Sequence, residues 1–265
     1  MKLKTVLLAT DGSDFSSGAE REGLALAEKC ACGLLLLQVV ELNPEVMALA
    51  PGLDEKLSGQ AKAHLEALSR QAQEAGLQCQ SLIVHSESPW RAIVQEAQRL
   101  GAGLIVLGRR GRTGLVRLLM GATAARVIGH SKVDVLVVPR AAKVGFDPVL
   151  AATDGSPYGD AAVERALQLA QDFGGRAVAL SVALSQEELA QAEEALKGAR
   201  ARGAEGITLV SRRPWEAIVQ EAQRLGAGLI VLGSHGRTGL QRALMGSVAE
   251  RVVGLAQGAV LVVKP

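Results

Sequence analysis

Two short segments of the chain combine a carboxylate with turn-forming residues. The sequence ATDGS follows an apolar run at 9–13, and the same five residues recur at 152–156. A serine followed by proline, as at Ser156, is typical of a helix N-cap with proline in the first helical position. A turn explains Asp11 and Asp154 less well, because each lies at the end of an apolar run. A carboxylate there can accept hydrogen bonds from a ribose hydroxyl or a base amine, so each aspartate is either a turn former or a ligand contact.

A second candidate site is the glycine-rich sequence GSHGRTG at 233–239, followed by Gly246 and Ser247 at the start of a helical stretch. Glycines let the backbone approach an anion closely and permit positive φ, so successive N–H groups can converge on a phosphate. The Ser247 hydroxyl adds a donor, and Arg237 and Arg242 add positive charge. Spaced glycines also form tight turns, but their place between an apolar run and a helix favours an anion site.

Both candidate sites belong to a duplicated sequence. Residues 89–140 and 214–265 align without a gap, and 36 of the 52 positions are identical. We therefore predict two domains, 1–140 and 146–265, joined by a short linker. The copies are offset by 125 residues here and by 143 at the ATDGS segments. The second copy is thus 18 residues shorter, and the missing part corresponds to the region around 42–60.

Each copy is expected to alternate strands and helices. In the first copy, unbroken apolar runs predict buried parallel strands at 5–10, 34–40, 80–85, 104–107 and 133–138. Apolar residues at helical spacing predict helices at 19–30, 61–75, 90–100 and 115–129. This alternation predicts an α/β fold with two tandem copies of a doubly wound, Rossmann-like parallel sheet. In such a sheet ligands bind at the carboxyl ends of the strands, where both candidate sites fall.

Composition narrows the class of protein. The 265 residues are 48% hydrophobic and only 2% aromatic, which indicates a globular protein with an aliphatic core. A net charge of +2 gives no support for a nucleic-acid or membrane partner, and no apolar run approaches the ~18 residues of a membrane helix. The first apolar stretch ends at Asp11 without a cleavage site, so it predicts a strand rather than a signal peptide. The three cysteines lack metal or redox spacing, and we expect a cytoplasmic location.

The spacing Gly233-x2-Gly236-x9-Gly246-Ser247 resembles the phosphate motif of the universal stress protein family, in its ATP-binding branch. The resemblance covers the chain twice, from each ATDGS segment to the last apolar strand. It implies a five-stranded parallel sheet in each domain and ATP, with or without Mg²⁺, as the ligand. It also implies that the last strands, at 135–138 and 260–263, pair between the two domains of one chain. A further homodimer stays open.

The resemblance also implies residue roles. Asp11 and Asp154 would hold the ribose, the backbone at Val39 and Val182 would meet adenine, and the glycine loops would hold phosphates. In full, the predicted nucleotide-binding residues are Ala9, Thr10, Asp11, Val39, Leu107, Gly108, Gly111, Arg112, Gly121, Ala122 and Thr123 in the first copy, and Ala152, Thr153, Asp154, Val182, Leu232, Gly233, Gly236, Arg237, Gly246, Ser247 and Val248 in the second.

The two sites are not equal in sequence. The first copy keeps the glycine spacing but has Ala122 where the motif has serine or threonine, and Thr123 stands next to it. Loss of one hydroxyl hydrogen bond costs about 0.5–1.5 kcal/mol. Arginines at 109, 110, 112 and 117 either compensate with charge or form a solvated loop face. The second copy has the complete motif but lacks the segment that helps to cover the base. We expect both sites to bind with unequal affinity, the better motif being in the second copy.

Three functional classes stay open at this point: an ATP-binding stress or signalling protein, which we favour, a slow ATPase, and an interaction scaffold whose pockets have lost their ligand. The sequence shows no paired carboxylates and no activated nucleophile. His235 lies in the second glycine loop, but the first copy has Arg110 there, so we assign no catalytic residue. His64, His85 and His130 show no metal-ligand spacing, and we predict no metal site of the protein's own.

Overall fold

The computed structural model describes the whole chain except residues 1–2, 43–44, 46–49, 51, 112–119 and 237–244. The chain divides into two compact units. The first contains Lys2–Leu115 and Gly121–Arg140, and the second contains Ala141–Pro265. Each unit holds one copy of the repeat, so the predicted α/β fold in two tandem copies is confirmed. The boundaries at 140 and 146 stay a prediction.

The first unit is a five-stranded parallel sheet with the strand order β3-β2-β1-β4-β5. Its elements in chain order are β1 (Thr5–Thr10), α1 (Ser17–Cys30), β2 (Gly33–Glu41), α3 (Leu53–Glu74), β3 (Cys79–Ser86), α4 (Pro89–Arg99), β4 (Leu104–Gly108), α5 (Ala122–His130) and β5 (Asp134–Val138). The central strands are rich in Val, Leu, Ile and Ala side chains that are almost wholly buried, as parallel strands covered on both faces require.

The second unit repeats this arrangement with the strand order β8-β7-β6-β9-β10. Its elements are β6 (Val149–Ala152), α6 (Pro157–Phe173), β7 (Ala177–Ala183), α7 (Leu189–Ala201), β8 (Glu205–Val210), α8 (Pro214–Leu225), β9 (Leu229–Gly233), α9 (Ser247–Leu255) and β10 (Ala259–Val263). In both units the strand order reverses direction between the first and fourth strands. A crevice at the carboxyl ends of these strands is the usual ligand site of such a sheet.

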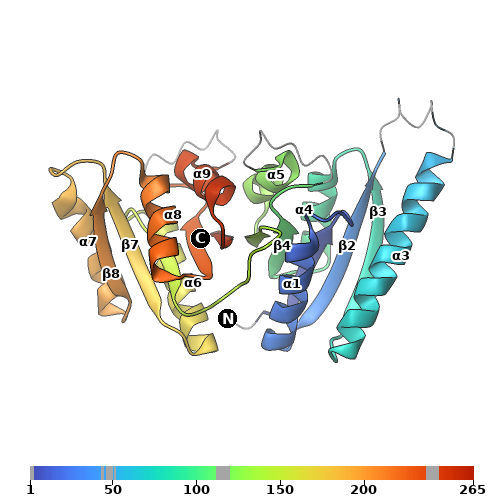
Figure 1. Ribbon diagram of the computed structural model, residues 1–265, viewed down its shortest axis with the longest axis horizontal. Coiled ribbons are helices and arrows are strands. Elements are labelled where there is room, and N and C mark those ends of the chain that lie inside the picture. The colour runs from blue at the N-terminus through green and yellow to red at the C-terminus, as the bar shows by residue number, and fades with distance from the viewer. Residues whose placement is uncertain (1–2, 43–44, 46–49, 51, 112–119, 237–244) are drawn as a thin grey trace. The chain divides into compact units, whose positions relative to one another are not determined.

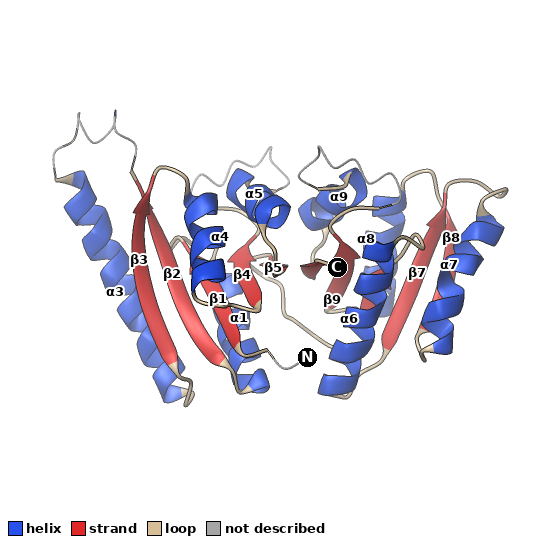
Figure 2. Cartoon of the chain, turned by 180° about the vertical axis from the view of Figure 1, so that it is seen from behind, coloured by secondary structure: helices blue, strands red, loops and turns tan. Residues whose placement is uncertain are grey.

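The helices of the first unit form two layers around its sheet. Right-handed crossovers from β1 to β2 to β3 place α1 and α3 on one face, whereas the crossovers that return to β4 and β5 place α4 and α5 on the other. Accordingly α1 lies in front of the sheet in Figure 1, and α4 lies in front of it in the reverse view of Figure 2. The side chains of α1 and α3 therefore meet on the same face.

Two helix boundaries differ from the prediction. The helix expected at 61–75 begins at Leu53, and Gly59 lies in an exposed turn of α3 with open space around its Cα. Of the helix expected at 115–129, residues 115–119 lie outside the described residues; α5 begins at Ala122, after Gly121 with extended backbone (φ −70°, ψ 147°). The remaining strands and helices predicted for the first copy agree with the structure to within two residues.

Candidate functional site

A cavity of about 300 Å³ opens at the carboxyl ends of β1, β2 and β4 in the first unit. The structure brings ten of the residues predicted for this copy around it, from three strands and the start of α5. They are Ala9, Thr10, Asp11, Val39, Leu107, Gly108, Gly111, Gly121, Ala122 and Thr123. Arg112 lies outside the described residues. The geometry is therefore that of one site, and the ligand-binding role of these residues stays a prediction.

The two oxygens of Asp11 have different surroundings. Oδ1 accepts hydrogen bonds from the backbone N–H of Ser13 at 3.0 Å and from its hydroxyl at 2.6 Å, which is the turn-forming role. Oδ2 faces the glycine loop, since a Cβ placed on Gly111 would lie 3.0 Å from it. The two roles left open by the sequence are thus compatible, because the turn uses one oxygen and the other lies against the loop.

The glycine loops of the two copies close in the same way. The N–H of Gly121 donates to the carbonyl of Arg109 at 2.9 Å, and that of Gly246 donates to the carbonyl of Ser234 at 2.9 Å. These two glycines are the N-caps of α5 and α9, and neither helix has a side-chain cap. A helix start without a side-chain cap leaves first-turn N–H groups for an anion, with the helix dipole in the favourable direction.

In the second unit the Asp turn meets the glycine loop in the same manner. Oδ1 of Asp154 accepts hydrogen bonds from the N–H and hydroxyl of Ser156 at 3.0 and 2.5 Å. A Cβ on Gly236 would lie 2.7 Å from Oδ2 of Asp154, so loop and carboxylate are in contact.

The other predicted residues of this copy lie on the neighbouring elements. Ala152 of β6 is paired in register with Leu232 of β9, Gly233 ends β9 and Val182 lies in β7. Thr153 follows β6, Gly246 caps α9, and Ser247 and Val248 begin this helix, with the Ser247 side chain exposed. Arg237 lies outside the described residues.

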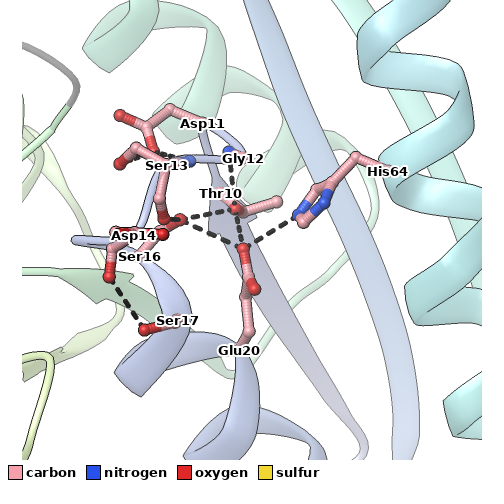
Figure 3. Close-up of polar contacts among 9 residues, drawn as sticks. All are labelled: Thr10, Asp11, Gly12, Ser13, Asp14, Ser16, Ser17, Glu20 and His64. Atoms are coloured by element: carbon pink, nitrogen blue, oxygen red, sulfur yellow. Dashed lines mark hydrogen bonds and ion pairs between the residues drawn. The ribbon is translucent and has the colours of Figure 1, made fainter.

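A polar cluster, formed by Thr10, Ser16, Glu20 and His64, supports the Asp11 turn of the first unit from the α1/α3 face (Figure 3). Oε1 of Glu20 accepts hydrogen bonds from the hydroxyls of Thr10 and, at 3.0 Å, of Ser16. Nε2 of His64, from α3, lies 2.9 Å from the same oxygen. Thr10 Oγ1 in turn accepts the N–H of Gly12. We call this group the Glu20 cluster; it ties two helices to the turn that carries Asp11.

The second unit has no such cluster at the matching positions. Ser16 and Glu20 correspond to Gly159 and Val163 at the offset of 143. His64 lies over Gly12 in the first unit, whereas Ala195 lies over Gly155 in the second. Both Asp turns have the same internal hydrogen bonds, but the first is also supported by the Glu20 cluster, whereas small side chains pack closely against the second.

The Glu20 cluster changes the acidity of its carboxyl group. Burial raises the pKa of Glu20, but the hydrogen bonds from His64, Thr10 and Ser16 together outweigh burial, so its pKa lies below the ordinary value of 4.5. A group with a lowered folded-state pKa contributes stability that is fully present above its unfolded pKa. That contribution is lost as the pH falls through the folded-state value.

We therefore expect Glu20→Gln to lower the free energy of unfolding by about 1–2 kcal/mol at pH 7, because the amide keeps the shape and loses the charge-assisted bonds. The deficit relative to wild type should shrink as the pH falls below about 4.5. Urea unfolding between pH 3 and 7 measures this difference. Glu164→Gln, on the exposed face of α6, is the matched control. A deficit that stays constant across this pH range would contradict the prediction.

Several residues at the site were missed by the sequence analysis. Gln38 lines the cavity and is 2% exposed, and its Oε1 has no hydrogen-bond partner among the described residues. Leu57 of α3, with Pro89 and Ile93 of α4, adds apolar walls. A signal existed for Gln38, because it is the single polar residue in the run LLLLQVV. Leu57 had none, since only the tertiary fold brings α3 over this edge.

The sequence matches a known protein family over most of its length. The model of the universal stress protein family matches residues 2–139, 145–202 and 182–264. The chain belongs to the universal stress protein family. A universal stress protein of Methanocaldococcus jannaschii is 32% identical over 148 residues, covering 53% of this chain and 84% of that protein. One from Mycolicibacterium smegmatis is 33% identical over 205 residues, covering 69% and 68%.

The solved structures give the same fold. A universal stress protein from Archaeoglobus fulgidus superimposes with a TM-score of 0.80 over 98% of this chain and 96% of that one, at 24% identity. Among the described residues of this universal stress protein, no helix combines the length and apolar character needed to cross a membrane. Nor do three or more His, Cys, Asp or Glu side chains gather anywhere in those residues as a metal site would require.

Proposed function

We propose that this universal stress protein is a stress-response or signalling protein that binds ATP at two sites, one in each domain, with unequal affinity. The observation that carries the proposal is the convergence of three features at the edge of each sheet. A strand-end aspartate presents one oxygen to a glycine loop, and that loop leads into a helix without a side-chain cap. Together they offer an acceptor for hydroxyl donors and amide donors for an anion, which suits a nucleotide.

The proposed pose follows from these parts. The ribose hydroxyls would donate to Oδ2 of Asp11 or Asp154, because Oδ1 is already used by the turn serine. The phosphates would lie on the first-turn N–H groups of α5 or α9, and the base would reach the end of β2 or β7 near Val39 or Val182. Mg²⁺ would arrive with the phosphates. We propose a holding site rather than a catalytic one, with slow hydrolysis at most.

The inequality of the sites would come from two differences. Ser247 supplies a hydroxyl at the start of α9, whereas the matching residue of α5 is Ala122. In the other direction, α3 has 22 residues and its Leu57 lines the first cavity, whereas α7 has only 13. The first site thus has the better apolar wall and the second has the more complete phosphate motif.

Domain pairing is a separate part of the proposal. Within their own units, β5 and β10 each pair with one neighbour, β4 and β9. An edge strand leaves ladder N–H and C=O groups unsatisfied, which supports pairing of these two strands within the chain. A partner protein that binds the surface of the paired domains would then respond to nucleotide occupancy.

Isothermal titration calorimetry of the nucleotide-free chain with ATP and Mg²⁺ tests the proposal. We expect about two ATP molecules per chain in two resolvable steps, since the lost hydroxyl alone is worth about 0.5–1.5 kcal/mol, or roughly two- to twelvefold in affinity. Heat-released extract of the freshly purified chain should contain adenine nucleotide. A chain that copurifies with none and takes up none in excess ATP would be an interaction scaffold instead.

A further inference from the structure

Two arginines lie between Gly108 and Gly111, the first two glycines of the phosphate loop in the first unit. Arg109 and Arg110 follow Gly108, and both line the cavity. The second copy has Ser234 and His235 at these positions. The backbone hydrogen bond that closes the loop, from Gly121 N–H to Arg109 O and from Gly246 N–H to Ser234 O, is 2.9 Å in both copies. The residue pairs therefore occupy equivalent places on the same loop.

The two guanidinium groups are crowded in a partly desolvated place. Both side chains are half-buried, and the buried Nε of Arg110 has no hydrogen-bond partner in the part of the chain that the structure describes. Burial, followed by the charge of Arg110, lowers the pKa of Arg109. An ordinary pair of surface arginines would turn outward into water. Holding two like charges at a cavity costs free energy, and a bound polyanion would offset that cost.

The remaining charges of the loop are the same in both copies. After the second glycine each copy continues RTGL, and Arg112 and Arg117 match Arg237 and Arg242 at the offset of 125. These four arginines lie outside the described residues, and they give both loops the same charge. The difference in loop charge between the two sites therefore comes from positions 109 and 110.

We propose that Arg109 and Arg110 make the first site selective for the number of phosphates, so that it takes nucleoside triphosphates far more tightly than monophosphates, whereas the second site discriminates less. This inference rests on the proposed function. Its physical basis is that each added phosphate brings further charge and oxygen atoms to paired guanidinium groups, which bind phosphate through bidentate hydrogen bonds. The second site offers a serine and a histidine instead, and its affinity would depend more on the ribose and base.

The test exchanges the two residues for those that the chain itself uses at the other site. The second site is first blocked by Gly236→Glu. This chain, with and without the further exchanges Arg109→Ser and Arg110→His, is then titrated with ATP, ADP, AMP and inorganic tripolyphosphate. We expect the double exchange to weaken the binding of ATP and tripolyphosphate by about tenfold or more for each guanidinium lost. The binding of AMP should weaken by less than about threefold. Before the exchange, raising the salt concentration from about 0.05 to 0.5 M should weaken ATP binding more than AMP binding. After the exchange this difference should be smaller.

Each other outcome is decisive. An equal loss for ATP and AMP, or no loss for either, would overturn the inference while leaving the nucleotide proposal intact. Binding of tripolyphosphate through these arginines without binding of any nucleotide would end the proposed function and the inference with it, and would leave a polyphosphate site. Absence of all binding to the first site would end both.

A reciprocal variant guards against a folding defect in the double exchange. His235→Arg in a chain whose first site is blocked by Gly111→Glu should raise the ratio of ATP to AMP affinity at the second site. An unchanged ratio there, in a chain with a normal far-ultraviolet circular dichroism spectrum, would count against the inference.

Discussion

Gly236→Glu should reduce the ATP bound per chain from two molecules to one. A Cβ at this position lies 2.7 Å from Oδ2 of Asp154, so any side chain displaces the loop or the carboxylate. A glutamate also places a second negative charge where the ribose and phosphates would approach, and like charges this close cost several kcal/mol in a partly desolvated site. Calorimetry with ATP should lose one binding step completely and leave the other unchanged.

The control for this variant is a glycine of the same unit away from the site. Gly198 lies in α7 with ordinary helical backbone, and a Cβ added there would come no closer to a described side chain than 3.9 Å, from Nη2 of Arg202. Gly198→Ala should keep both binding steps. Two intact steps in the Gly236→Glu chain would mean that the nucleotide does not contact this loop.

Gly18→Ala should cause the largest loss of stability among single methyl additions to the first unit. A Cβ on Gly18 of α1 would lie 2.4 Å from the carbonyl oxygen of Pro139, and 2.7 and 2.9 Å from the oxygen and Cα of Arg140. All three are backbone atoms just after β5, so relief requires movement of the helix or the strand end. Overpacking of this kind costs about 1–3 kcal/mol, occasionally more. Thermal unfolding should show the first unit melting lower, by roughly 2–4 °C per kcal/mol.

Two positions serve as references for that effect. Gly59 lies in an exposed turn of α3 with open space around it, so Gly59→Ala should raise stability by about 0.5–1 kcal/mol, because alanine is the better helix former. In the second copy the residue matching Gly18 is Ala161, which shows that a methyl group is compatible with this turn of the helix elsewhere. If the Gly18→Ala and Gly59→Ala variants unfold at the same temperature, the close packing at Gly18 does not restrict the side chain at this position.

The predicted parts of the fold are those encoded by neighbouring residues. The five strands of the first copy are continuous apolar runs, and a buried parallel strand needs nothing more to be recognised. The duplication follows from identity at a fixed offset. The spacing of Gly108, Gly111 and Gly121 marks the loop after the fourth strand, since this loop combines a strand end, three spaced glycines and a helix start. Local order thus predicted the strands and the glycine positions around the cavity.

Local patterns failed where a boundary depended on packing. The helix predicted from residue 61 begins at Leu53, because packing of α3 over β2 and β3 offsets the weak helix propensity of Gly59. The predicted helix at 115–129 runs through Gly121, where the structure has the N-cap of α5. The extended backbone of Gly121 fixes the true start.

The sequence by itself determined that this protein is two copies of one α/β domain, each with a strand-end aspartate and a glycine loop. Only the tertiary structure decided which side chains surround this aspartate and loop. It placed His64 of α3 against Glu20 of α1, 44 residues earlier, and the parallel register set Gln38 beside Thr10. The physical reason is that crossovers bring together residues from separate elements, and no local period records which side chains will share a face.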